Sequence, residues 1–595
     1  MLWVKLLCLF LPILATAASE DAVTLFSANC QSCHQAGHTT RAPLPEALKA
    51  KQPKEILAAL ETGSMRPQAS HLTAAQRLLL ANHLGSTEAP KVSTAGYCAP
   101  NFPATTDSTF WNGWAVDQSN SRFQPADQAK LSVSEVGKLK LKWAFGFPGS
   151  NSAFSQPALV GGKLYFGSDN GTVYAVNAKT GCIYWTYKAA ATVRVAITIA
   201  ATTHNRYVAY FGDIQANVYG VDTETGKEIW KTKVDEHRYA RVTGAVKLYG
   251  DRIYVPVSSV EEVSPSSPKY ECCTFRGSVQ ALEAATGKVV WKTYTIPDEP
   301  KPTKKNSAGT QLYGPSGGAV WLSPTIDVKR KVLYVGTGNG YSDPATAFSD
   351  SIQAIDLATG KRMWVQQATK GDGWNFSCNS GKVNCPEENG PDVDFGASPI
   401  LAKNRDGKDI ILAGQKSGVV HAFDPDAGGK VLWQTRIGKG GALGGIQWGI
   451  AADKEKVYAA LSDRNPGKPE LEGGLFALSI ATGEKLWHTP APTPACAGTP
   501  NCSAAQMSPV TVIPGVAFSG SMDGHLRAYD AADGKIIWDY NTMIEYETVN
   551  GVKAKGGSLG GGSGPVIAGG MLFLNSGYGA LAGIPGNVLL AFSKE

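Results

Sequence analysis

The chain has 595 residues and a formal net charge of +6, with 56 basic and 50 acidic residues. The basic residues are scattered among acidic ones and form no basic block, which argues against nucleic acid as the main partner. The length allows one large and one small domain, and the 66 glycines suit the many tight turns of an all-β fold.

Residues 1–18 have the features of a secretory signal peptide. Lys5 precedes an apolar core, and the small residues Ala17 and Ala18 mark the expected cleavage point. No later stretch is apolar for long enough to span a bilayer. We therefore expect a monomer that is periplasmic or secreted, in an oxidising compartment.

The eleven cysteines suit such a compartment. Cys8 leaves with the signal peptide, and Cys30 and Cys33 belong to a haem motif. Two pairs bracket short polar loops and are predicted to be local disulfides, namely Cys378 with Cys385 and Cys496 with Cys502. Cys272 and Cys273 are adjacent in the sequence. Cys98 and Cys182 are then left, and we pair them with each other by elimination.

Residues 19–90 are predicted to form a small haem domain. Cys30-Gln-Ser-Cys33-His34 is a c-type attachment motif, in which two thiols add to the porphyrin and the histidine binds the iron. The domain resembles a class I cytochrome c.

Met65, in the turn GSMRP, is expected to be the second axial ligand, which raises the iron potential. His71 and His83 are rival ligands. Residues 72–84 have helical spacing and would pack back on the haem, and 91–110 have the composition of a linker.

A strand–turn–strand pattern that ends in Trp recurs through the remaining chain. Each copy places an Asx/Gly turn before the second strand, which is hairpin chemistry. The seven copies end at Trp185, Trp230, Trp291, Trp364, Trp433, Trp487 and Trp538. Their spacing of 45 to 73 residues holds four short strands, which is one blade of a β-propeller.

An eighth Trp, Trp143, lacks the preceding strand and turn. Its missing partner is predicted at Asn587 to Phe592, so that the two ends of the large domain share one blade. Residues 111–595 are therefore predicted to form an all-β, eight-bladed propeller whose closure removes long free edges.

The stretch 315–341 places Trp321 ahead of an apolar strand and Asn339 after it. The run VLYVGTG reads as a strand buried on both faces. The segment resembles quinoprotein alcohol dehydrogenases, in which the Trp forms the floor under pyrroloquinoline quinone (PQQ) and the Asn binds a metal ion.

Residues 243–262 resemble the stretch of the same family that supplies Thr, Ser and a metal-binding Glu. The match implies Thr243 and Ser258 as cofactor contacts and Glu261 as a metal ligand beside Asn339. Glu262 is adjacent and could exchange roles with Glu261. Carboxylate and amide oxygens suit a hard cation, here calcium or a lanthanide.

Further cofactor contacts follow from the resemblance. The family has a vicinal disulfide over the quinone, matched here by Cys272 and Cys273, although this pair falls one blade later than expected. A carboxylate-binding Arg corresponds to Arg194, with Arg276 as the alternative. Lys416, expected on an apolar strand, would hydrogen-bond the quinone oxygens, and Gln447 and Trp448 would line the pocket.

The general base of the family belongs to an Asp-aromatic pair. Counting forward from the Thr359-Gly360 turn reaches Asn375, whose amide cannot accept a proton. Counting back from the next strand reaches Asp392, and matching the Asp-aromatic pair reaches Asp394. We expect the base to be one of these two, with Asp372 as a distant alternative.

A haem domain ahead of the propeller resembles the polyvinyl-alcohol dehydrogenases, which are quinohaemoproteins. The resemblance implies proton transfer to Asp392 or Asp394 and hydride transfer from a polymeric or bulky secondary alcohol to PQQ. Electrons would then pass to haem c and to an external cytochrome c. The alternatives are a dehydrogenase for a small primary or sugar alcohol, and a non-catalytic scaffold with an electron-carrier domain.

Overall fold

The computed structural model describes residues 21–35, 45–49, 51–61, 65–69, 71–86, 96–99, 108–201, 207–465, 472–494, 496–579 and 583–594. The predicted signal peptide at 1–18 lies outside them. The chain divides into two compact units, 1–92 and 93–595. Among the described residues, no helix is both long enough and apolar enough to cross a bilayer.

The first unit is helical. Its described helices are α1 (Ala22–Asn29), α2 (Pro45–Lys49), α3 (Pro53–Glu61), α4 (Arg66–Ala69) and α5 (Ala74–Leu84). The predicted helix at 72–84 is confirmed as α5, and it begins after Thr73 because Thr73 and Gln76 form a reciprocal capping box. Leu25, Leu60 and Leu80 belong to one buried core.

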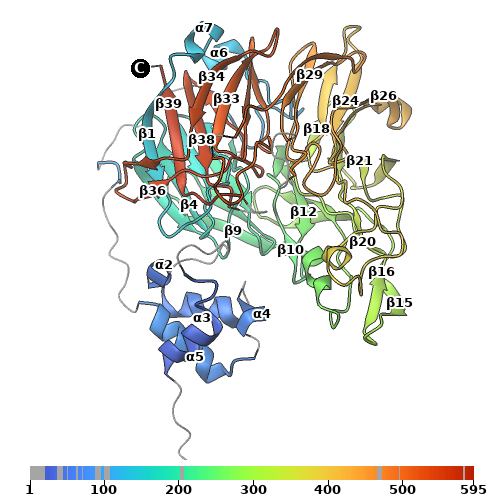
Figure 1. Cartoon of the computed structure of the whole chain (residues 1–595). Helices are drawn as coiled ribbons and strands as arrows, with labels where there is room; N and C mark the ends of the chain where they lie inside the picture. The colour runs from blue at the N-terminus through green and yellow to red at the C-terminus, as the bar shows by residue number, and fades with distance from the viewer. Residues whose placement is uncertain are drawn as a thin grey trace, which may run out of the picture. The chain divides into compact units, whose positions relative to one another are not determined.

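The second unit is a ring of eight antiparallel sheets, as predicted (Figure 1). The first four sheets in chain order are β2 (Ala158–Val160), β3 (Lys163–Phe166), β4 (Thr172–Asn177) and β5 (Ile183–Lys188); β6 (Thr198–Ala201), β7 (Tyr207–Gly212), β8 (Asn217–Asp222) and β9 (Glu228–Lys233); β10 (Ala240–Arg241), β11 (Lys247–Tyr249), β12 (Arg252–Ser259), β13 (Ser278–Glu283) and β14 (Val289–Tyr294); and β18 (Thr325–Asp327), β19 (Val332–Gly336), β21 (Ser351–Asp356) and β22 (Arg362–Gln367).

The other four sheets complete the ring. They are β23 (Ile400–Lys403), β24 (Asp409–Gly414), β25 (Val419–Asp424) and β26 (Lys430–Arg436); β27 (Ala451–Ala452), β28 (Lys456–Ala460), β29 (Leu475–Ser479) and β30 (Lys485–Thr489); β31 (Thr511–Ile513), β32 (Val516–Gly520), β33 (His525–Asp530) and β34 (Ile536–Asn541); and β37 (Val566–Ala568), β38 (Met571–Ser576), β39 (Val588–Ser593) and β1 (Lys140–Gly146). The run VLYVG is confirmed as β19, buried at every residue.

Short elements lie between or outside the sheets. They are the helices α6 (Ala126–Ala129) and α7 (Val133–Val136), the 3-10 helices η1 (Glu261–Ser266), η2 (Phe376–Asn379) and η3 (Pro425–Ala427), and the strands β15 (Lys301–Lys305), β16 (Gln311–Gly314), β17 (Ser316–Gly317), β20 (Gly340–Ser342), β35 (Glu545–Tyr546) and β36 (Ala554–Lys555).

The ring closes where its two ends meet. β1 pairs with β39 in antiparallel register, with Trp143 opposite Ala591 and Gly146 opposite Val588. Figure 1 shows β1 in cyan beside β39 in red-orange. The shared closing blade predicted from Trp143 and 587–592 is confirmed.

The repeated Trp and Gly together join neighbouring sheets. The Trp185 indole nitrogen donates to the Thr223 carbonyl of the next sheet at 2.7 Å, and Trp230 donates to Ala284 in the same way at 3.0 Å. The Trp185 ring lies against Gly226, where an added Cβ would come within 2.8 Å of it, and Gly226 has φ +69°. Glycine is therefore required both for the turn and for the docked indole.

The central segment 111–124 runs across the inner strands of all eight sheets. It hydrogen-bonds in turn to Leu159, Ile199, Leu248, Ile326, Leu401, Ala452, Val512 and Ile567. One short segment can reach all eight strands only if they line a common centre. The central segment thus fills the middle of the ring and joins every blade.

Arg122 anchors the central segment through neutral acceptors, and no carboxylate among the described residues pairs with it. Its fully buried guanidinium donates to the Val510 carbonyl at 2.7 Å, to Gln156 Oε1 at 2.8 Å and to Thr511 Oγ1 at 2.8 Å. It also lies 4.7 Å from the Trp114 ring centroid. A charge taken this far from water needs such a set of acceptors.

The four predicted disulfides are all present. Cys98–Cys182, Cys272–Cys273, Cys378–Cys385 and Cys496–Cys502 are bonded. The first links the segment before the ring to the start of β5, so the assignment by elimination was correct.

Candidate active site

The side chains expected at the cofactor site come from one end of the ring. In a four-stranded antiparallel sheet of this order, the loop between the second and third strands lies at the same end as the connection to the next sheet. Thr243 lies between β10 and β11, and connections between sheets carry Arg194, Trp321, Asp392, Asp394 and Trp448. Glu261 lies between β12 and β13, Asn339 between β19 and β21, and Lys416 between β24 and β25.

Trp321 lies in a small aromatic group. The Trp448 ring meets it edge-on with 5.2 Å between centroids, and Arg194 lies 5.1 Å from the Trp448 centroid. The backbone of Gly396 is so close that an added Cβ would lie 3.1 Å from the Trp321 ring. Trp321 remains partly exposed, so part of its surface stays accessible to a flat ligand.

Lys416 is buried beside this ring, with Nζ 4.9 Å from the Trp321 centroid. It lies in the turn after β24, because that strand ends at Gly414, so the expectation that Lys416 lies on a strand was wrong. Its Nζ contacts Asp394 Oδ2 at 2.6 Å and Asp392 Oδ1 at 3.2 Å. Burial acts to lower the pKa of Lys416, but the two aspartates outweigh it and raise the pKa above its ordinary value.

The two aspartates have different surroundings. Asp394 also accepts from the Asn339 backbone N–H at 2.6 Å, so two strong donors hold its carboxylate. Asp392 has the single, longer contact with Lys416 and a φ of +59°. Burial raises the pKa of Asp392 well above its ordinary value against the pull of Lys416, with Asp394 and Glu262 adding to the rise.

Asp372 and Asn375 have supporting positions. The Asp372 carboxylate accepts from the backbone N–H groups of Asp392 at 2.9 Å and Val393 at 2.8 Å. It therefore fixes the backbone that carries Asp392. The Asn375 amide donates to the carbonyls of Tyr341 at 2.9 Å and Asn384 at 2.8 Å.

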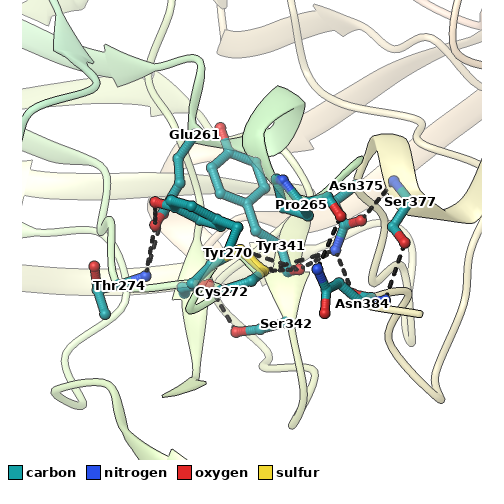
Figure 2. Close-up of a disulfide and its surroundings, with 12 residues drawn as sticks. Glu261, Pro265, Tyr270, Cys272, Thr274, Tyr341, Ser342, Asn375, Ser377 and Asn384 are labelled. Atoms are coloured by element: carbon teal, nitrogen blue, oxygen red, sulfur yellow. Dashed lines mark hydrogen bonds between the residues drawn. A yellow bond between two sulfur atoms is a disulfide. The ribbon is translucent and has the colours of Figure 1, made fainter. Parts of the chain in front are cut away.

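Glu261 is completely buried, and its carboxylate faces the chain that follows it. It accepts from Tyr270 Oη at 2.8 Å, from the Thr274 N–H at 3.0 Å and from the Phe275 N–H at 2.8 Å. Figure 2 shows Glu261 directed at Tyr270 and Thr274. These donors already occupy the oxygen atoms expected to bind a cation.

Glu262 interacts with the other side of the site. Burial and the neighbouring Asp394 raise the pKa of Glu262 to about 7, while Lys416 opposes the rise. Burial and the charge of Glu262 raise the pKa of Tyr341 well above its ordinary value. Between the adjacent glutamates, Glu262 is the one coupled to the Lys416 cluster.

Carboxyl groups outnumber cations in this cluster. Asp350 is fully buried, and both of its carboxylate oxygens lack a hydrogen-bond partner. Burial raises the pKa of Asp350 well above its ordinary value, and Asp372 and Asp394 add to the rise. Lys416 thus lies among several buried carboxyl groups, and burial favours the neutral form of Asp350 and Asp392.

The vicinal disulfide is buried beside the Tyr341 backbone. Both sulfur atoms are 3.9 Å from the Tyr341 carbonyl oxygen, and the disulfide belongs to a buried cluster against which Trp321 also packs. Asn384 donates to the Pro265 carbonyl at 2.9 Å, which ties the Cys378–Cys385 loop to η1 (Figure 2). This loop therefore supports the 3-10 helix that carries the glutamates.

The remaining expected contacts separate into two groups. Thr243 donates to the Trp321 carbonyl at 3.1 Å, and Ser258 is buried opposite Arg241 in the β10–β12 pair. Gln447 is buried and donates to the Gly444 carbonyl at 2.6 Å. Arg276 instead stacks on Tyr294 at 3.9 Å and donates to the Pro297 carbonyl, away from Lys416.

The expected haem ligands gather in the helical unit. Cys30 follows α1, and the His34 N–H donates back to the Cys30 carbonyl at 3.1 Å. Neither Cys30 nor Cys33 forms a disulfide, and His34 is buried. Cys30 and Met65 pack against the same core, whereas His71 hydrogen-bonds to Asn29 at 2.8 Å.

Known proteins resemble this chain over nearly its whole length. A family model described as the glucose/ethanol/alcohol dehydrogenase β-propeller domain matches 235–383, and one described as outer membrane protein assembly factor BamB matches 104–269 and 416–586. A polyvinylalcohol dehydrogenase of Pseudomonas sp is 40% identical over 97% of this chain and 94% of the relative. One of Sphingopyxis sp. (strain 113P3) is 41% identical, over 97% and 93%.

The chain belongs to the polyvinylalcohol dehydrogenase family. It is accordingly an alcohol dehydrogenase of the PQQ-dependent class. The structure of the quinohemoprotein alcohol dehydrogenase from Comamonas testosteroni superposes with a TM-score of 0.59 at 20% identity, over 82% of this chain and 80% of that one. That structural likeness supports the eight-bladed propeller fold of this chain.

Several residues of the cluster lay outside the sequence prediction. Asp350 gives no sequence signal, because a buried carboxyl at a strand start looks like any turn Asp. Tyr341 follows Asn339 at a spacing of two and so points to the same side of an extended segment, which was a usable signal. The central segment has no repeat and shows its role only through its contacts.

Proposed function

We propose that this dehydrogenase oxidises secondary hydroxyl groups of polyvinyl alcohol or a similar bulky alcohol. The observation that carries the proposal is the buried Lys416, Asp392 and Asp394 cluster on the face of Trp321. The substrate follows from relatives that carry this name at 40% and 41% identity over 97% of the chain.

The side chains around Trp321 fit the quinone. PQQ is flat and carries carboxylate and quinone oxygens, and Trp321 offers a partly exposed ring. The Trp448 indole nitrogen is buried without an acceptor, so it has a donor to give to such an oxygen. We assign Lys416 and Arg194 as the cations beside the ring, and Thr243, Ser258 and Gln447 as the surrounding wall.

A divalent or trivalent cation suits the excess of carboxylates. We assign Glu262 as its carboxylate ligand, with Asn339 beside it, and choose calcium or a lanthanide because the donors are oxygens. In the described part of the chain, no three His, Cys, Asp or Glu side chains are arranged to hold a metal ion. The cation would therefore need oxygens of the cofactor as well.

Asp392 is assigned as the group that accepts the hydroxyl proton. A general base works best when its pKa lies near the working pH, and burial moves the pKa of Asp392 upward. Asp394 positions Lys416 and the Asn339 backbone, and Asp372 positions the Asp392 backbone. When bound, PQQ supplies the carbon that accepts the hydride.

Electrons are proposed to leave through haem c in a cytochrome c domain at 19–90, joined by the linker 91–110 to the propeller at 111–595. Cys30 and Cys33 would attach the haem, and His34 and Met65 would bind its iron. An external cytochrome c is the proposed acceptor. The signal peptide at 1–18 supports a periplasmic or secreted protein, and we propose a monomer.

The proposal is tested with protein loaded with quinone and calcium. Haem reduction is followed with polyvinyl alcohol, pentane-2,4-diol and ethanol at equal hydroxyl concentration. We expect the polymer and the diol to reduce the haem and ethanol to be slow; fast ethanol oxidation without polymer oxidation would replace the substrate assignment.

The base is tested in the same assay with matched variants. Asp392→Asn should lower kcat by about 10²–10⁴-fold, because a general base typically contributes that factor. Asp394→Asn should lower kcat and should also raise the Kd for quinone binding. A near-normal kcat for Asp392→Asn would move the base to Asp394.

A further inference from the structure

A cavity of about 520 Å³ lies outside the Trp321 cluster, at the ends of the outer strands β9 and β14. Asp235, His237, Thr274, Arg276, Lys292 and Tyr294 are among its lining residues. Its volume falls within the roughly 300–1,000 Å³ typical of ligand sites. None of the roles proposed above uses it.

The inner wall of the cavity is the chain that holds Glu261. The Thr274 backbone N–H donates to Glu261, while the Thr274 hydroxyl lies 3.1 Å from His237 Nε2 inside the cavity. His237 Nε2 also lies 3.7 Å from Glu261 Oε1. The cavity therefore lies next to η1, which also carries Glu262.

The charges that line the cavity are balanced. Three basic side chains (Lys233, Arg276 and Lys292) face three acidic ones (Asp235, Glu236 and Glu299). Lys292 Nζ lies 2.7 Å from Asp235 Oδ2, and Arg276 covers the Tyr294 ring at 3.9 Å. An ion of either sign would meet as much repulsion as attraction, which argues against an anion or cation site.

A neutral ligand with many hydroxyl groups fits this lining better. Each hydroxyl group both donates and accepts a hydrogen bond, and the cavity offers ammonium and guanidinium donors next to carboxylate acceptors. The methylene groups between hydroxyls could pack on the exposed parts of Tyr294 and the Lys292 stem.

We propose that this cavity binds a segment of the hydroxylated polymer while another segment of the same chain reacts at the Trp321 site. The inference rests on the proposed polymer substrate and adds a second contact for it. Two linked contacts raise the local concentration of the next hydroxyl group at the reacting site, and this increases affinity without changing the chemical step.

The test compares Lys292→Met with Lys231→Met in quinone-loaded protein. Lys292 lines the cavity and lies 4.7 Å from the Tyr294 centroid, whereas Lys231 lies 5.6 Å from the Tyr219 centroid and does not line it. Lys292→Met keeps the aliphatic stem and removes the charge. Lys292→Arg restores a donor.

Lys292→Met should raise the KM for polyvinyl alcohol about tenfold, which corresponds to the loss of one hydrogen bond to a charged group. Its kcat on the polymer and both constants on pentane-2,4-diol should match those of Lys231→Met. Calorimetric binding of the polymer without electron acceptor should weaken by a similar factor, and Lys292→Arg should recover most of it.

An unchanged polymer KM, or an equal rise for the diol, would overturn the subsite. Failure of the proposed substrate has a different signature. The wild-type protein would then bind the polymer more tightly than Lys292→Met does, but it would oxidise only the diol. That result would retain the subsite and reject the polymer as substrate. Polymer oxidation that does not depend on Lys292 would reject the subsite and retain the polymer as substrate.

Discussion

Replacing Lys416 with Met should destabilise the propeller in a strongly pH-dependent way. The substitution leaves Asp392 and Asp394, which are 6% and 4% exposed, without their shared counterion. At contacts of 2.6 and 3.2 Å, each attraction is about 5–6 kcal/mol for an effective dielectric constant near 20. Desolvation offsets much of this, and removing one partner of a buried pair typically costs about 3–5 kcal/mol.

The cost should be largest at alkaline pH. Without Lys416, the pKa of Asp392 rises further above the unfolded value of about 3.9. The folded protein then holds more protons than the unfolded chain, and by linkage its stability falls as the pH rises through the raised pKa. We therefore expect a deficit of about 3–5 kcal/mol at pH 8 that shrinks toward pH 5.

Urea unfolding of cofactor-free protein, followed by tryptophan fluorescence, measures this deficit. Lys535→Met is the matched control, because its pair with Asp533 has a similar 2.7 Å contact but is 80% and 46% exposed. That surface pair should contribute little to stability, because both groups are solvent-exposed. A Lys416→Met deficit that is below about 1 kcal/mol at pH 8, or equal at both pH values, would refute the reasoning.

Three further substitutions test other parts of the molecule. Glu262→Gln should weaken calcium-dependent quinone loading by more than the roughly 10–100-fold typical of an outer-shell partner. Glu261→Gln should mainly lower the unfolding temperature. Equal loading defects in the two variants would contradict the assignment of Glu262, rather than Glu261, as the cation ligand. Met65→Ala should remove the sulfur–iron charge-transfer band of oxidised haem, and an unchanged band would move the ligand elsewhere. Arg122→Met should lower the free energy of unfolding by at least about 3 kcal/mol, because several buried acceptors lose their donor; a change below about 1 kcal/mol in urea titrations would show that water replaces it.

The ring could be predicted from the sequence because its signals are local. Each Trp needs a Gly in the next turn, so the contact between blades is written into the repeat itself. The closing pair of Trp143 with 587–592 followed from the same rule, since one copy lacked its strand. The central segment was missed because its contacts join residues far apart in sequence and follow no period.

Which residues belong to the site could be predicted from the sequence, but the direction in which each side chain points could not. Lys416, Asp392, Asp394 and Trp321 were expected together and lie together. The adjacent glutamates show the limit, since η1 turns Glu261 toward Thr274 and leaves Glu262 to interact with Asp394. Side chains of consecutive residues in a helical turn point in different directions, and small shifts in where the turn begins exchange them.

The carboxylate cluster also links the cofactors to the stability of the fold. Lys416 interacts with Asp392, Asp394 and Glu262, and burial together with the charge of Asp394 raises the pKa of Glu262 to about 7. A cation bound at Glu262 would relieve that repulsion in the folded state only, and a ligand that binds only the folded state stabilises it by mass action. The carboxylates assigned to the cofactor site would therefore make the propeller more stable with a bound cation than without one.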